Sequence, residues 1–553
     1  MSGKAWVAVL ILVASGYLTF TGLDNTYFWD DEAEMGIVAR NFLSTGQLTA
    51  WDGRNLFAPR NGKTLTRELT VNEPPLSSLV TALSFRLLGI STWAARFPFA
   101  IAGLATLFVF AMILREEFGT QSWLWVYALG SLALSVTFLL FIRQCRYYAL
   151  SLLFSSLTYY AYRKCLATRH LLWFIIVGIS SILLFFSNYL VGGAFLGSLT
   201  ILHLVFHRKS FSIIDWGKMA LSVTIFAGAT VPYGVTHSIW YRPAQIMGPP
   251  EPWLARKLTV LWWNLIDIDR ISALPWVTVV LLTFLLILRR ERKLGRITLE
   301  WAIVGLGNVI IVALTSPQPT NVPTVADVRY LIASLPFFAG FTGVFIWLLH
   351  QWKKPLGPVM LAALLCSNVF TINMLDNRII GGMTIIKGAR WLLPAYIREV
   401  HNNYPTSIAV ASNFLNKNAR QDDLVYVLPS EYNWPLLFYV GEKIKLCCFL
   451  NEKSPLSKED MRKLQAPLFI DEHYPDWVVV FGAHPEALKM VRAFSRPHLR
   501  GLQVVNFNYQ LVQTLDAYWR QTQRPELFWH SFGPKTDFDR DRLGVYIFRR
   551  AKY

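Results

Sequence analysis

The chain has 553 residues, of which 54% are hydrophobic and only 16% are charged, and its formal net charge is +18. Soluble domains carry about 25% charged residues, so this composition excludes a purely soluble protein. The 14% of aromatic residues excludes a disordered chain, and five cysteines are too few for a disulfide scaffold. The composition therefore indicates a multispanning membrane protein with room for one soluble domain.

Apolar runs in the first 375 residues predict about eleven membrane-spanning helices, each near the ~20 residues that a crossing needs. The runs lie at 5–23, 94–114, 121–141, 147–162, 171–190, 191–206, 218–232, 274–289, 299–315, 330–349 and 357–375. A signal peptide is the alternative for the first run. We favour an uncleaved span, because the polar loop that follows it, about 24–93, looks like a functional segment rather than like the N-terminus of a mature protein.

The distribution of basic residues predicts the orientation of these spans. Lys and Arg collect in the short loops 115–119, 163–170, 207–210, 289–296 and 352–354. These loops alternate with short loops that are poor in Lys and Arg, apart from Arg143, Arg146 and Arg329. Cytoplasmic loops of membrane proteins are enriched in basic residues, so the net charge requires no nucleic-acid partner. An odd number of spans, beginning in the cytoplasm at Lys4, places residues 376–553 outside.

The C-terminal segment, 376–553, has the pattern of a soluble α/β domain, distinct from the membrane domain 1–375. Alternating apolar residues predict strands at 424–429, 436–441, 477–482, 504–515 and 545–550, and a helix is expected at 485–496. Cys447 and Cys448 are adjacent, so we expect a buried apolar role for them rather than a redox role.

Four carboxylates stand where the first span leaves the membrane, namely Asp30, Asp31, Glu32 and Glu34. Acids at the N-terminus of a helix are favourable, so one or two of them could serve as a helix cap. Four are more than a cap needs, and charged groups at a membrane boundary are costly unless they are used. We therefore expect at least one of them to be functional.

Basic and aromatic residues on the same predicted face complete a candidate site. They are Arg54, Arg60, Lys63, Arg67, Arg143, Arg146 and Arg329, accompanied by Glu73, Tyr147, Tyr148 and Tyr330. Interfacial anchoring is the alternative for the tyrosines. Arginines match the geometry of phosphate in a bidentate manner, so a lipid phosphate is the expected ligand.

A carboxylate beside a phosphate site suggests transfer of a sugar from a lipid phosphate. The carboxylate would take a proton from an acceptor hydroxyl. The phosphate would leave as a stable anion, so no protein acid is needed, unlike in glycosidases. Direct displacement with a single base would invert the anomeric centre.

These residues resemble the membrane-embedded glycosyltransferases of the GT-C class. The segments that carry the resemblance are 29–47 (WDDEAEMGIVARNFLSTGQ), 73–104, which includes the sequences EPPL and AARFP, 143–150 (RQCRYYAL) and 328–338. The nearest likeness is to bacterial relatives of protein O-mannosyltransferases and to lipid A aminoarabinose transferases. The likeness covers about residues 1–350.

The resemblance implies a polyprenyl-phosphate sugar donor such as an undecaprenyl phosphate, a cavity facing the periplasm, and a bacterial inner-membrane location. It implies Asp31 as the catalytic base, with Glu32 or Asp30 shaping the site. Many relatives have Lys where this chain has Glu73, so Lys63, Arg67 or Arg146 is expected to meet the phosphate instead.

Several alternatives remain at this point. A transporter or flippase of lipid-linked sugars would place its charges near mid-membrane, whereas here they gather on one face. A non-catalytic scaffold would tolerate Asp31→Asn. An oligosaccharide transferase of the same class is not separated from a monosaccharide transferase, and the acceptor is a protein, lipid A or a polysaccharide. We expect no obligatory cofactor, although Asp30, Asp31, Glu32 and Glu34 could hold Mg²⁺ or Mn²⁺.

Overall fold

A computed structural model describes most of residues 3–551. The ranges that it leaves out are 59–61, 63–64, 67, 71–72, 120–121, 238–251, 273–291, 317–326, 368, 370–378, 381–382, 385–390, 404, 429–431, 448–453, 455, 466–474, 483–497, 501–502, 506–508 and 519–541.

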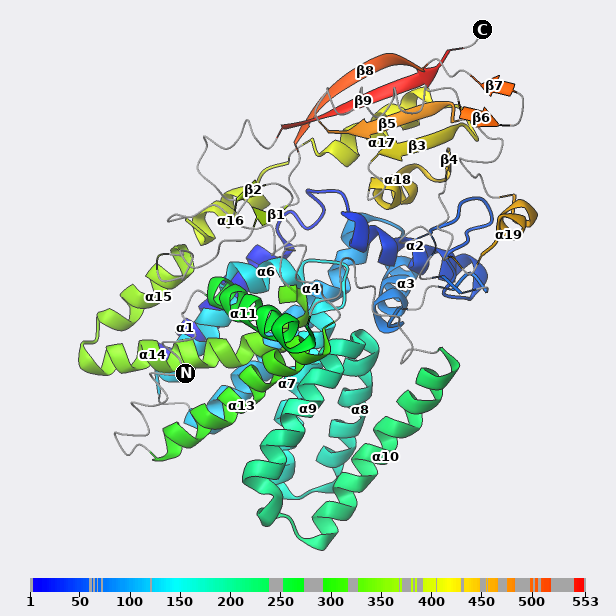
Figure 1. Cartoon of the computed structure of the whole chain (residues 1–553). Coiled ribbons are helices and arrows are strands. Elements are labelled where there is room, and N and C mark those ends of the chain that lie inside the picture. The colour runs from blue at the N-terminus through cyan, green and yellow to red at the C-terminus, as the bar shows by residue number, and fades with distance from the viewer. Residues whose placement is uncertain are drawn as a thin grey trace. The chain divides into compact units, whose positions relative to one another are not determined.

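The chain forms two compact units (Figure 1). The helical unit includes residues 1–21 and 99–401, and the mixed unit includes 22–98 and 402–521. The loop 24–93, which the sequence predicts to be the first outer loop, therefore belongs to the same unit as the C-terminal segment, although more than three hundred residues separate them in the chain. The expected domain boundary at residue 375 lies outside the described residues and stays a prediction.

Helices make up most of the described part of the helical unit. They are α1 (Gly3–Phe20), α4 (Thr92–Phe118, which begins in the mixed unit), α5 (Leu124–Ala133), α6 (Val136–Ile142), α7 (Tyr148–Thr168), α8 (Leu171–Ser187), α9 (Tyr189–Leu202), α10 (Ile213–Thr236), α11 (Trp253–Ser272), α13 (Arg292–Thr315), α14 (Leu335–Trp352), α15 (Leu356–Cys366) and α16 (Leu393–Val400). Short turns η2 (His203–His207), η3 (Arg208–Ser210), η5 (Asp327–Tyr330) and η6 (Ile332–Ser334) connect them, and β1 (Ile379–Ile380) pairs with β2 (Met383–Thr384).

The chain is a multi-pass membrane protein. Among the described residues, six helices are long and apolar enough to cross a bilayer, or seven if α5 and α6 form one span bent by 56°. The single span expected at 121–141 is therefore broken at Leu134 and Ser135. Shorter apolar helices are α3 (Leu76–Leu88), α8 and α15. The expected run 274–289 lies outside the described residues, so the count of about eleven spans stays a prediction.

Close helix packing in this unit depends on small residues. A Cβ atom at Gly343 of α14 would come within 2.5 Å of Ala128 of α5, so the two helices can approach this closely only with glycine there. Small residues at helix contacts are typical of membrane bundles, where van der Waals packing replaces the hydrophobic driving force.

Buried charges join four helices at the ends that carry the basic loops. The Arg163 guanidinium on α7 lies 2.5 Å from Glu300 on α13 and 2.7 Å from Glu117 on α4. Glu300 also accepts from Arg296 at 2.9 Å and lies 3.4 Å from His207 of η2. We call these contacts the inner network, after the predicted cytoplasmic side of the basic loops. Because each of its carboxylates faces a guanidinium, we expect the network to hold the helices together.

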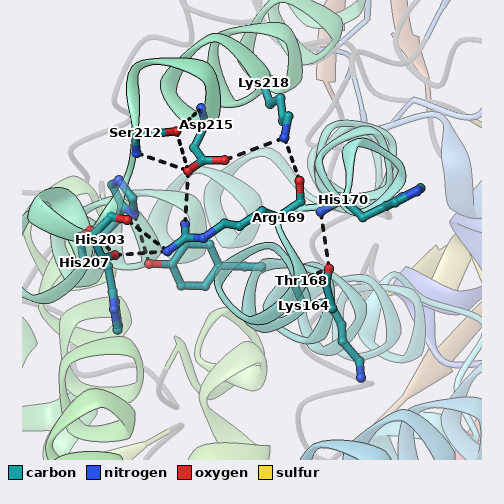
Figure 2. A network of polar contacts seen from close by, with 11 residues as sticks. Lys164, Thr168, Arg169, His170, His203, His207, Ser212, Asp215 and Lys218 are labelled. Carbon is teal, nitrogen blue, oxygen red and sulfur yellow. Dashed lines mark hydrogen bonds and ion pairs between the residues drawn. The ribbon is translucent and has the colours of Figure 1, made fainter.

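A second polar cluster, seen in Figure 2, joins the turn after α7 to the start of α10. Arg169 donates to the Ser210 carbonyl at 3.1 Å, and Lys218 donates to the Arg169 carbonyl at 2.7 Å. Ser212 and Asp215 form a reciprocal capping box at the N-terminus of α10. These contacts satisfy the free amides of a helix end and fix two neighbouring turns.

The mixed unit combines helices with one five-stranded sheet. Its helices are α2 (Asp30–Thr45), α3, α17 (Ser407–Asn418), α18 (Asn433–Val440) and α19 (Lys458–Lys463). Its strands are β3 (Leu424–Leu428), β4 (Lys445–Leu446), β5 (Trp477–Phe481), β6 (His498–Arg500), β7 (Gln503–Val505), β8 (Tyr509–Tyr518) and β9 (Arg542–Arg550). The sheet order is β4-β3-β5-β9-β8, and β6 pairs separately with β7.

The sheet is mixed in direction. Strand β3 runs parallel to β4 and β5, whereas β9 is antiparallel to both β5 and β8. Tyr426, Cys447, Val478 and Phe548 belong to the buried core on one face, so the expected apolar role of Cys447 is confirmed. Cys448 lies outside the described residues.

The sequence predictions for this domain are correct for three strands and wrong for one. Strands β3, β5 and β9 lie where alternation predicted them, and the run 504–515 contains the end of β7 and part of β8. The strand expected at 436–441 is instead the helix α18. A short run that is apolar on every side has no periodicity to separate strand from helix, and Pro435 in its first turn favours the helix. The helix expected at 485–496 lies outside the described residues.

Candidate functional site

The acids of the first outer loop form the first turn of α2. Trp29 is the N-cap residue, and Asp30, Asp31 and Glu32 follow it. The Asp30 carboxylate accepts from the Asp31 amide at 2.9 Å. Both aspartates are half-buried, so part of each residue remains accessible from outside the protein. Their negative charge is favourable there because the N-terminal end of a helix carries partial positive charge.

Glu32 is held by a buried arginine. Arg96 Nε donates to Glu32 Oε1 at 2.8 Å and Arg96 Nη2 to Oε2 at 2.7 Å, and neither side chain is exposed. Arg96 Nη1 also donates to the carbonyls of Leu23 and Thr26, at 2.8 and 2.9 Å. This bidentate pair therefore anchors both the first turn of α2 and the segment that precedes it.

Sequence analysis missed Arg96 as a partner of Glu32. A signal was present, because Arg96 is the one charged residue within the apolar start of α4. A buried guanidinium requires a carboxylate or several carbonyls. Proximity along the chain could not show which of the four acids it meets.

Neighbouring carboxylates thus have different environments. Glu32 is fully buried and paired, Glu34 is 8% exposed, and Asp30 and Asp31 are half-buried. Carboxylates placed in different surroundings take different roles in acid–base chemistry. This arrangement favours an aspartate, rather than Glu32, as the group that exchanges a proton with a substrate.

Arg54, expected at a phosphate, lies against the C-terminal segment. Its guanidinium is 3.0 Å from the Asp422 carboxylate and donates to the carbonyls of Glu442 and Lys443, at 2.7 and 2.9 Å. Glu73 lies in the bend before α3. The other basic residues predicted in this loop, Arg60, Lys63 and Arg67, lie outside the described residues.

Arg143, another expected phosphate ligand, caps the end of α1. Its Nη1 atom donates to the carbonyls of Leu18, Thr19 and Thr21, at 2.8, 2.8 and 2.7 Å. Cations are favourable at a helix C-terminus, where carbonyl groups lack partners. Arg143 is only 1% exposed, so its side chain serves as a buried cap of this helix end.

The remaining basic residues stand among tyrosines. The Arg146 guanidinium lies 5.6 Å from the Tyr147 ring centroid, and that of Arg329 lies 5.2 Å from the Tyr330 ring centroid. The Tyr147 and Tyr330 rings stack at 6.3 Å with an interplanar angle of 12°. The start of α7 and the turn η5 therefore bring two Arg-Tyr pairs together, although about 180 residues separate them in the chain.

These residues form two groups, one in each unit. The mixed unit holds Asp30, Asp31, Glu32 and Arg54, and the helical unit holds Arg146 and Arg329. In the part of the chain that the structure describes, His, Cys, Asp and Glu do not gather in groups of three or more that could hold a metal ion.

Comparisons with known proteins agree with the resemblance to the GT-C class. A family model described as dolichyl-phosphate-mannose-protein mannosyltransferase matches residues 72–232. The structure of ArnT from Cupriavidus metallidurans bound to undecaprenyl phosphate matches with a TM-score of 0.56 and 13% identity, covering 99% of this chain and 98% of that one. ArnT in the apo state matches over the same shares, with a TM-score of 0.55 and 15% identity. A search of curated protein sequences returns no match.

The structural matches extend over the whole chain, and the chain has the fold of ArnT. The expected fold class, a polytopic helical membrane protein with the GT-C fold, is thereby confirmed, and the periplasmic C-terminal α/β domain stays a prediction.

Proposed function

We propose that this protein is a glycosyltransferase that moves a sugar from a polyprenyl-phosphate donor to an acceptor hydroxyl, with Asp31 as the base. The observation that carries the proposal is the start of α2, where two half-buried aspartates adjoin the buried Glu32–Arg96 pair. The fold shared with ArnT and the family match at 72–232 support the same reaction class.

The proton and the sugar move in one displacement. The Asp31 carboxylate takes the proton of the acceptor hydroxyl, and the acceptor oxygen forms a bond to the anomeric carbon. The bond between that carbon and the phosphate oxygen breaks, and the lipid phosphate leaves with the electron pair. Attack opposite to the leaving group inverts the anomeric centre.

Arginines stabilise the charge that the departing phosphate gains. Arg146 and Arg329 carry this role in the proposal, because the tyrosine rings beside them hold their guanidinium groups at one place in the helical unit. Preorganised cations act most strongly where charge develops in the transition state. Tyr147 and Tyr330 would then line the cavity for the phosphate. Arg54 and Arg143 already bond to carbonyl groups, so the proposal gives this role to Arg146 and Arg329 instead.

The lipid carrier in the proposal is a polyprenyl phosphate, in keeping with the undecaprenyl phosphate bound to ArnT. We place the enzyme in a bacterial inner membrane with residues 376–553 in the periplasm, following the alternation of basic loops. The acceptor is a hydroxyl of a protein, of lipid A or of a polysaccharide. Catalysis proceeds without an obligatory metal in this proposal, and a chelator tests that point.

The decisive experiment compares Asp31→Asn with Asp24→Asn, an exposed aspartate of the same loop that lies outside α2. Both variants and the wild type are purified and offered a panel of undecaprenyl-phosphate monosaccharides, with and without chelator, and release of the lipid phosphate is followed. We expect Asp31→Asn to lose at least about 100-fold in rate, the usual scale of a general base. Asp24→Asn should match the wild type.

Full activity in Asp31→Asn would assign the base to another carboxylate, with Asp30 tested next. A wild type that releases no phosphate from any donor, even with acceptor extracts added, would overturn the proposal and favour a transporter of lipid-linked sugars.

A further inference from the structure

The first turn of α2 has little support from its own cap. Trp29 at the N-cap is extended, with φ −87° and ψ 174°, and its side chain makes no capping hydrogen bond to the helix. The Glu32–Arg96 pair holds this turn from the residue after Asp31, and contacts of the residues before Asp30 can hold it from the other side. A catalytic base must be placed closely, because a shift of about 1 Å can cost ~100-fold in rate.

One tyrosine of the C-terminal domain bonds to this segment. The Phe28 amide, two residues before Asp30, donates to the Tyr439 hydroxyl at 2.9 Å. The same hydroxyl lies 2.7 Å from Thr92 Oγ1. Since the Tyr439 oxygen accepts from the amide, its own hydrogen can bond to Thr92. A single hydroxyl thus links the approach to α2 with the start of α4, four residues before Arg96.

Aromatic packing holds the same segment from the side. The Tyr27 ring lies 4.0 Å from the Tyr439 ring, and the Phe28 ring lies 4.7 Å from the Phe438 ring, measured between centroids. A Cβ atom at Gly36 would come within 2.9 Å of Phe438 and 3.0 Å of Phe28. The helices α2 and α18, which lie together in Figure 1, are therefore as close as glycine allows.

The turn that follows α18 is bonded to the first loop as well. The Asn55 amide donates to the carbonyls of Gly441 and Ile444, at 3.0 and 3.2 Å, and its oxygen accepts from the Leu446 amide at 2.9 Å. Asn55 is only 1% exposed. The contact between loop and domain is thus continuous from α18 to β4, rather than a touch at one point.

We propose that α18 is a positioning element for the catalytic carboxylates, acting through Tyr439 and Phe438. The inference rests on the proposed function, because it takes Asp31 as the base. The C-terminal domain then contributes to the chemical step by fixing the backbone of residues 27–31. Burial raises the pKa of Tyr439 far above its ordinary value, so the hydroxyl stays protonated at every working pH.

The test removes the Tyr439 hydroxyl and keeps the ring, in Tyr439→Phe. The matched control is Tyr426→Phe, a buried tyrosine in the sheet core of the same domain. With an undecaprenyl-phosphate sugar as substrate, Tyr439→Phe should lower kcat about 10-fold and leave the donor KM within about twofold, because a positioning contact acts in the transition state. Tyr426→Phe should leave kcat unchanged.

Amide hydrogen exchange of the segment 27–34 gives a readout that does not depend on activity. We expect faster exchange in Tyr439→Phe, and also in Thr92→Val, which removes the other partner of the hydroxyl and serves if Tyr439→Phe fails to fold. Unchanged exchange in the folded variant would overturn the inference, as would faster exchange with an unchanged kcat, or an equal loss of kcat in Tyr426→Phe. If the wild type turns over no donor, the proposed function fails, and exchange alone decides the positioning contact.

Discussion

Two ion-paired arginines in this protein, the half-buried Arg163 and the fully buried Arg96, differ in the residues that stand beside them. In the inner network, Arg163 joins Glu117 and Glu300 from two other helices. In the first outer loop, Arg96 joins Glu32, and the next residues toward the N-terminus are Asp31 and Asp30, both half-buried. The carboxylates of the inner network face guanidinium groups directly, whereas the Glu32–Arg96 pair holds one carboxylate and stands next to two half-buried aspartates.

In the proposed reaction, the buried Glu32–Arg96 pair would position the base without itself taking part in the chemical step. Burying two charges costs solvation, and good geometry with further hydrogen bonds is needed to repay that cost. Arg96 meets this condition by donating to two carbonyls in addition to Glu32. The pair is therefore a fixed point in the loop, and Asp31 is placed by being covalently next to it.

Of the substitutions that test this comparison, removal of Arg96 should cause the largest loss in the free energy of unfolding. Arg96→Met leaves Glu32 buried without its partner, so we expect a loss of about 3–5 kcal/mol in the free energy of unfolding. Thermal unfolding in detergent would measure the loss. The double variant Arg96→Met with Glu32→Gln should recover part of it, because no unpaired charge then remains. An unchanged melting temperature in the single variant would mean that the pair does not anchor the loop.

A substitution in the inner network should lower the stability of the protein without lowering its activity. In Arg163→Met we expect a loss of about 1–3 kcal/mol, smaller than for Arg96. The reason is that the Arg163 side chain is 22% exposed and that of Arg96 is fully buried. Turnover of lipid-linked sugar per folded molecule should remain at the wild-type level. A large fall in turnover at full folding would show that the two regions are not distinct in function.

The smallest effect is expected for Arg296, whose side chain is 58% exposed although it bonds to the same Glu300. Arg296→Ala should cost about 0–1 kcal/mol, since solvent screens an exposed ion pair. The measurement is again the melting temperature, with Arg163→Met as the reference. Equal losses in the two variants would contradict the view that burial, rather than the number of ion pairs, decides the contribution.

Predictions from sequence were correct where the local pattern is typical of only one kind of secondary structure. Alternation in 477–482 and 545–550 predicted β5 and β9, and long apolar runs predicted helices such as α4, α10 and α14. They failed at 436–441, where a uniformly apolar run has no period to read and forms α18. That error concealed a contact, because the helix α18 packs on α2.

The sequence by itself determined the membrane class, the cluster of acids before 35, and the resemblance to GT-C glycosyltransferases, since composition, local spacing and motifs are properties of the chain alone. Only the tertiary structure decided that Arg96 holds Glu32, that Arg143 caps α1, and that Tyr439 bonds to the residue two before Asp30. Each of these contacts joins residues that are from 64 to 411 positions apart. Partners at such separations are chosen by packing and by the need of every buried polar group for a partner, and neither is visible in a local pattern.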